Sequence, residues 1–83
     1  MTGLIFRECS QVRVRQLIEV NRPFNGSQNV MRPPEIGDTG IVVHITQHRW
    51  DGSLIYLVEK ASPDGGTVWR ADFVAEELAS VHP

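Results

Sequence analysis

The sequence predicts one small all-β domain in which five short strands curl into a barrel. Three observations favour this fold class: strict alternation of polar and apolar residues after Gln11, an apolar segment at 39–46 without helical spacing, and two strong turn signals. The chain has 83 residues, of which 41% are hydrophobic, as expected for a single globular domain. We therefore expect an N-terminal extension at residues 1–10, followed by one domain at residues 11–83.

The first strand is predicted from the segment that begins QVRVR at Gln11. Val12 and Val14 fall on one side of an extended chain, while Gln11, Arg13 and Arg15 fall on the other. A period of two with β-branched residues is typical of a strand with one buried face.

A long loop is expected at 21–37, where the chain is rich in proline, glycine and asparagine. Loops of this length are uncommon in compact domains unless they have packing or a purpose of their own. Phe24, Val30, Met31 and Ile36 are spaced through it. We expect these apolar residues to hold the loop against the core.

A hairpin and a fourth strand follow in the middle of the chain. Strands are predicted at 39–46 and 53–59, joined by the Asp-Gly turn in HRWDG at 48–52. The sequence SPDGG at 62–66 predicts a second turn, and TVWR at 67–70 a short fourth strand.

The last segment, from Asp72 onward, has two interpretations. Residues 72–79 could form two turns of helix capped by Asp72, or 75–78 could form one helical turn before a short final strand at 80–81. We favour the single turn, because five short strands protect their edges best by curling into a small barrel.

Three segments give residues 11–81 a resemblance to a known fold group: Val12-Arg13-Val14, Gly37-Asp38-Thr39-Gly40-Ile41-Val42-Val43 and Glu76-Glu77-Leu78-Ala79-Ser80-Val81. They resemble the SH3-like small barrels of bacteria and plastids, such as the variable chain of ferredoxin–thioredoxin reductase and ribosomal KOW-type modules. The resemblance implies that the Gly-Asp-x-Gly segment leads out of the long loop, and that the Glu-Leu pair closes one barrel end. It also implies an accessory or regulatory role. The tyrosine-rich run and paired tryptophans of proline-peptide-binding SH3 domains do not occur here.

Charge is distributed unevenly along the chain. The net charge is −2, but residues 1–34 sum to +3 and residues 35–83 to −5. Either a basic first strand and loop sit against an acidic remainder, or the surface is bipolar and steers a charged partner. The net acidity disfavours RNA binding, because ribosomal modules of this type are usually strongly basic.

Composition also bears on location. No apolar run reaches the ~18–20 residues that span a bilayer, and the first residues lack a basic segment followed by an apolar core. The single cysteine, Cys9, excludes an internal disulfide framework and a cysteine-based zinc site. We therefore expect a cytoplasmic protein without a membrane partner.

Candidate catalytic and metal-binding groups are weak. Cys9 has no histidine nearby in sequence, so it lacks the neighbouring base that activates a catalytic thiol. His44 and His48 are four residues apart, which in a strand is ~13 Å and too far for one metal ion. Glu76 and Glu77 point in different directions on a helical turn, so we expect them to be solvated. The sequence predicts no enzyme activity, no metal and no cofactor.

The candidate binding residues form two groups. Trp50 and Arg49 lie in the predicted hairpin turn and are a candidate anchor for a protein, although Trp50 folding over the barrel mouth is an equal alternative. Tyr56, Trp69 and Phe73 are expected to fill the barrel. A second group could contact an acidic protein or phosphates: Arg13, Arg15, Arg22 and Arg32.

The leading functional hypothesis is a non-catalytic protein–protein interaction module that docks on a larger enzyme or complex as an accessory or regulatory subunit. One alternative is a nucleic-acid or ribosome-associated KOW-like module. Another is a small immunity or inhibitor protein whose acidic half covers a toxin, through Asp64, Asp72, Glu76 and Glu77. The expected partner is a protein, acidic in character, and a second copy of the chain is an additional candidate.

Overall fold

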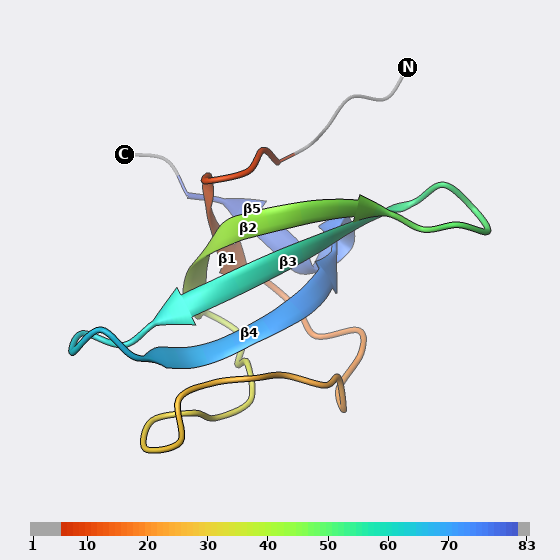
Figure 1. Ribbon diagram of the computed structural model, residues 1–83. Helices are drawn as coiled ribbons and strands as arrows, with labels where there is room; N and C mark the ends of the chain where they lie inside the picture. The colour runs from red at the N-terminus through yellow and green to blue at the C-terminus, as the bar shows by residue number, and fades with distance from the viewer. Residues whose placement is uncertain (1–5, 82–83) are drawn as a thin grey trace.

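The computed structural model describes residues 6–81, which form one antiparallel sheet of five strands (Figure 1). In chain order the elements are β1 (Gln11–Val14), β2 (Thr39–Gln47), β3 (Leu54–Ala61), β4 (Thr67–Val74), the 3₁₀ turn η1 (Ala75–Glu77) and β5 (Leu78–Ser80). The strand order is β4-β3-β2-β1-β5, so β4 and β5 are the two edges of an open sheet. The predicted all-β class is confirmed.

Most predicted elements lie where the sequence places them, with changes at their ends. The helical turn before the last strand is confirmed, and β2 and β3 form the expected hairpin. β4 continues to Val74, beyond the predicted end at Arg70, because Ala71 and Phe73 keep pointing into the core. β5 starts at Leu78 instead of Ser80, since Leu78 pairs with Val14 of β1.

The core lies on the inward face of the sheet. Tyr56, Trp69 and Phe73 are each at most 1% exposed, which confirms the prediction that these aromatic residues fill the interior. Large aromatic side chains bury the most apolar surface per residue and dominate the stability of a small core. The aliphatic residues around them are Val12, Val14, Val42, Val58, Val68, Ala71 and Leu78.

Residues 6–10, which the sequence places in an N-terminal extension, contact the sheet. Phe6 is 5% exposed and its ring meets Tyr56 edge-on, with 5.3 Å between ring centroids. The backbone N–H of Cys9 donates to the carbonyl of Val42 at 2.7 Å, and the N–H of Val42 donates to the carbonyl of Ser10 at 3.0 Å. These contacts hold the segment against the sheet, while the rest of the predicted extension lies outside the described residues.

The long loop folds back along the outer edge of β4, as Figure 1 shows. Asn25 exchanges two backbone hydrogen bonds with Arg70, at 3.0 and 2.8 Å, and Ser27 donates to the carbonyl of Thr67 at 2.8 Å. The N–H of Arg32 donates to Val68 at 3.1 Å. The loop thus supplies the hydrogen bonds that an exposed edge strand lacks.

The apolar residues of the loop behave differently from one another. Phe24 packs against the core and Val30 is half-buried, in agreement with the expected return of the loop. Met31 and Ile36 are 50% and 66% exposed, so their predicted role as anchors is wrong. Backbone bonds to β4 hold that part of the loop instead.

Helical structure within residues 6–81 is limited to η1, and no helix there has the length and apolar character needed to cross a membrane.

Candidate functional site

The turn between β2 and β3 carries the most exposed large apolar side chain of the described residues. Trp50 is 86% exposed, and the hairpin extends past the rest of the sheet (Figure 1). Of the two alternatives left by the sequence, the exposed tryptophan is the one observed. Exposing an indole ring to water is unfavourable, and burial of Trp is among the largest contributions at protein interfaces.

The backbone of this turn is held by local bonds. The N–H of His48 donates to the carbonyl of Ser53 at 2.6 Å, and the N–H of Gly52 donates to the carbonyl of His48 at 3.0 Å. Gly52 has φ of 73°, a left-handed conformation that glycine adopts without a steric penalty. These bonds fix the direction of the turn while leaving the Trp50 side chain free.

Side chains add a second layer of bonds within the turn. The N–H of Trp50 donates to Nδ1 of His48 at 3.2 Å. The backbone N–H and the hydroxyl of Ser53 both donate to Asp51, at 2.9 and 2.7 Å, and these bonds lower the pKa of the Asp51 carboxyl. Arg49 is exposed and makes no ion pair with any residue in 6–81. Its charge is available beside the indole.

Arg13 lies on the outward face of β1, as the alternation predicts, and Arg15 follows directly after the strand. Both are exposed, and the side chain of Arg15 makes one hydrogen bond, from its guanidinium to the carbonyl of Glu76 at 3.3 Å, while its backbone N–H donates to the carbonyl of Glu77 at 2.8 Å. Neither forms an ion pair within the described part of the chain. These two predicted cations remain accessible.

Arg22 is the clearest correction to the predicted binding set, because it is 8% exposed. Its guanidinium forms a two-pronged ion pair with Glu77 and lies over the ring of Phe73, 4.4 Å from the centroid. It also donates to the backbone carbonyls of Glu19 and Asp72. A side chain held by this many contacts cannot reach a partner.

Glu77, expected to be solvated, is 1% exposed. Besides Arg22, it accepts hydrogen bonds from the backbone N–H groups of Ile18, Glu19 and Val74. Burial raises the pKa of Glu77, but the bonds from Arg22 and these three backbone groups lower it by more, so it stays ionised. Glu77 therefore joins the long loop to the end of β4, and the predicted acidic binding surface loses one member.

Arg32 is also committed within the fold, although it is partly exposed. Its guanidinium meets both oxygens of Asp38 at 2.8 and 2.9 Å. Asp38 accepts two more bonds, from Nε1 of Trp69 at 2.8 Å and from the N–H of Glu35 at 2.9 Å. Burial raises the pKa of Asp38, and the bonds from Arg32, Trp69 and Glu35 lower it by more, to about 2.

The remaining polar candidates are dispersed. His44 lies 3.6 Å from Glu8, and His48 lies 3.4 Å from Asp51. Within residues 6–81, no three side chains of the types that bind metals come together. Cys9 is exposed and has φ of 70°.

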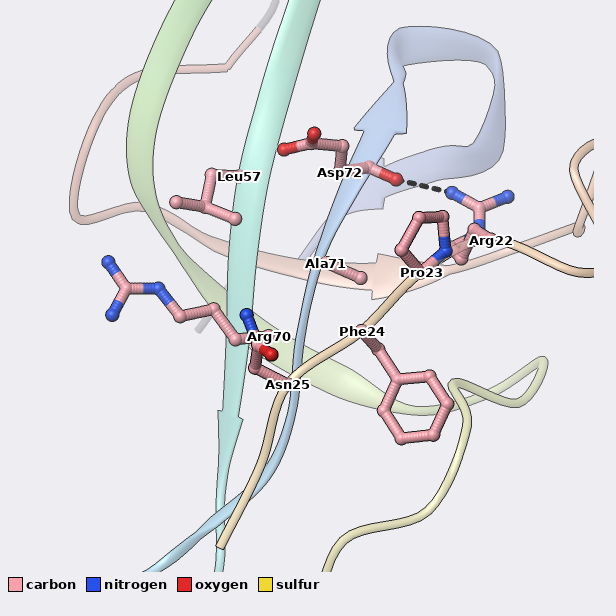
Figure 2. Close-up of a pocket in the computed structure, with 8 residues that line it drawn as sticks. All are labelled: Arg22, Pro23, Phe24, Asn25, Leu57, Arg70, Ala71 and Asp72. Carbon is pink, nitrogen blue, oxygen red and sulfur yellow. Dashed lines mark hydrogen bonds between the residues drawn. The ribbon is translucent and has the colours of Figure 1, made fainter.

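A shallow groove of about 190 Å³ lies between the long loop and the outer face of the sheet (Figure 2). Residues 22–25 form one wall, and Leu57, Arg70 and Asp72 extend from β3 and β4 beside it. The groove therefore combines apolar side chains with two arginines, Arg22 and Arg70, and one acid, Asp72.

Neither a protein-family model, nor a curated protein, nor a solved structure matches this chain. Its function is therefore argued from the geometry above.

Proposed function

We propose that this chain is a non-catalytic interaction module that docks on a larger protein through the β2–β3 turn. The observation that supports the proposal is Trp50, which is 86% exposed at the end of a turn whose backbone is internally bonded. Burial of a tryptophan removes ~200 Å² of surface from water, worth up to ~5 kcal/mol at ~25 cal/mol per Å². One residue of this kind is enough to anchor a modest interface.

The partner surface that fits this turn is apolar at its centre and acidic at its margin. Arg49 adjoins Trp50 and has no acid partner within residues 6–81. Arg13 and Arg15 add exposed positive charge on β1. Because exposed charges act mainly on the rate of encounter, we expect the association rate to fall as salt is raised.

The proposed fold group is the SH3-like small barrel, in its accessory-subunit form. Four features support it: β1 pairs with both β2 and β5, a long loop follows β1, β2 changes register between Val42 and His44, and η1 precedes β5. A register shift of this kind bends a strand and lets one sheet curl. The proposed compartment is the cytoplasm, where a protein with one cysteine needs no disulfide.

The test is capture of partners by the tagged full chain from a lysate, comparing the unmodified protein with Trp50→Ala. Val20→Ala is the matched control, since Val20 is 74% exposed and lies outside the turn. We expect a stoichiometric protein that withstands nuclease, is lost with Trp50→Ala and is kept with Val20→Ala. Thermal melting of each variant shows whether the fold is intact.

Two results would overturn the proposal. Equal capture by Trp50→Ala and the unmodified chain would remove the turn from the interface. Loss of every partner after nuclease treatment would favour the nucleic-acid alternative, with Arg13 and Arg15 as the next residues to substitute.

A further inference from the structure

We propose that the outer face of β3 and β4 is a contact between two copies of this chain. Arg70 and Asp72 lie two residues apart on β4 and both point outward, because Ala71 and Phe73 alternate with them into the core. The two side chains leave the strand on the side of Leu57 without meeting each other (Figure 2). On β4 the face thus carries one positive and one negative charge in a row, and Glu59 of β3, the cross-strand neighbour of Arg70, adds a second acid.

Both charges lack an ion-pair partner among residues 6–81. The guanidinium of Arg70 has no carboxylate within the 4.0 Å of an ion pair, although Glu59 is its neighbour across the strands. The carboxylate of Asp72 makes no hydrogen bond or ion pair with any residue in 6–81, and Arg22 bonds to the backbone carbonyl of Asp72 instead. By contrast, Arg22 and Arg32 are each paired with an acid. The outer face therefore has charge that the fold itself does not use.

Apolar side chains accompany these charges. Ile55, Leu57 and Val74 point outward and are half-buried, and none of them packs against the core. Ile55 pairs across the strands with Val74, and Leu57 with Asp72. On β2, Ile41 is 41% exposed and lies opposite Glu59, while His44 and Thr46 lie opposite Leu57 and Ile55. These residues shield one another only partly, so covering them would remove further apolar surface from water.

A second copy fits the charge pattern because the pattern is complementary to itself. A two-fold axis that crosses β4 at Ala71 turns the strand end for end. It sets Arg70 of each copy against Asp72 of the other copy. The same Arg70–Asp72 ion pair therefore forms twice in the dimer.

The size of the face predicts a weak dimer. β3 and β4 have eight residues each, and eight residues at ~3.3 Å give a length of ~26 Å. With the neighbouring β2, the flat area is a few hundred Å², below the ~800 Å² per partner of a typical stable complex. We therefore expect a dimer that dissociates on dilution.

Sedimentation velocity of the full chain tests the proposal, at concentrations from ~1 μM to ~1 mM. The unmodified chain should move from monomer to dimer as its concentration rises. Arg70→Asp and Asp72→Arg should each weaken association at least ~10-fold, because each places like charges opposite one another. Arg13→Asp, which makes the same charge change on β1, is the control and should still dimerise.

The most specific test of the two-fold contact is sedimentation of an equimolar mixture of the two variants. Arg70→Asp carries two acids on the face and Asp72→Arg carries two arginines, so the mixed pair regains both contacts. A dimer in the mixture, absent from either variant alone, supports the two-fold contact. Thermal melting of the variants establishes that they are folded.

The proposal is overturned if the unmodified chain stays monomeric at the highest concentration, or if folded variants fail to associate when mixed. A third outcome is that Arg70→Asp leaves sedimentation unchanged but no longer captures the protein that binds through Trp50. The face would then bind that protein, and the dimer would be rejected. The dimer does not depend on the docking function, since Trp50→Ala should leave sedimentation unchanged.

Discussion

The long loop after β1 and the turn between β2 and β3 both carry arginines, but they use them differently. Arg22 and Arg32 of the long loop pair with Glu77 and Asp38, and the loop backbone bonds to β4. Among residues 6–81, the hydrogen bonds of the β2–β3 turn stay within the turn and its adjoining strand ends, and Arg49 pairs with no described residue. An arginine in a loop is available to a partner only when no carboxylate of the same fold forms an ion pair with it.

Among substitutions that break a contact of the long loop, loss of Glu77 should have the largest effect on stability. Glu77→Ala leaves the buried guanidinium of Arg22 without its carboxylate, a change that typically costs about 3–5 kcal/mol of unfolding free energy. Urea or thermal unfolding measures it. Glu76→Ala, at the exposed neighbouring position, should change stability by less than ~0.5 kcal/mol. Equal effects at the two positions would show that the ion pair does not hold the loop.

Gly26 tests whether the backbone of the long loop must approach β4 closely. A Cβ at this position would stand 2.5 Å from Cβ of Met31 in the same loop, 2.8 Å from the carbonyl oxygen of Val68 and 3.0 Å from that of Thr67. Gly26→Ala should therefore cost ~1–3 kcal/mol, as overpacking does. Gln28→Ala, at an exposed position of the same loop, is the control. Urea unfolding that shows no difference between these variants would contradict the close approach.

Acid should weaken the long loop through Asp38. Its pKa in the folded chain is about 2, below the usual value of 3.8, so its contribution is complete above that usual value and is lost as pH falls toward 2. This lowered pKa corresponds to ~2 kcal/mol of unfolding free energy at neutral pH. Glu77, whose pKa is also lowered, acts in the same direction.

Stability measured between pH 6 and pH 2 checks this sign. Asp38→Asn should be less stable than the unmodified chain at neutral pH and should lose less stability on acidification. An unchanged pH profile in Asp38→Asn would show that Arg32 and Trp69 do not depend on this carboxylate.

Trp50 should have the smallest effect on stability and the largest on binding. Its side chain is 86% exposed, so Trp50→Ala should change the unfolding free energy by less than ~0.5 kcal/mol. Trp69→Ala, at a fully buried position, should cost ~3–5 kcal/mol. A large loss of stability with Trp50→Ala would mean that the ring packs on the sheet and is not a free anchor.

Local chemistry predicted most of the fold. Alternation identified β1, and the Asp-Gly turn and the SPDGG segment located the ends of β3 and the start of β4. Each of these signals depends only on residues that are neighbours in sequence, so it can be recognised without knowledge of the fold. Phe6 was missed because it follows a segment without any period, and its burial depends on Tyr56, fifty residues away.

The same distinction explains the candidate site. Arg13 and Arg49 are exposed, as their positions in an alternating strand and a tight turn predict. The sequence left two alternatives for Trp50, and its position in the turn could not decide between them. Arg22 was misassigned because its partner, Glu77, is 55 residues away in sequence. A weak signal did exist, since the +3 balance of residues 1–34 and the −5 balance of 35–83 favoured contact between the two parts.

Amide hydrogen exchange in the free protein tests the contrast between the two loops most directly. The account predicts that the amides of Asn25, Ser27 and Arg32, which donate to β4, exchange as slowly as those of the sheet, while those of Arg49 and Asp51 exchange near the rate of an unprotected chain. Fast exchange in both loops, or protection at Arg49 and Asp51 equal to that at Asn25, would contradict it.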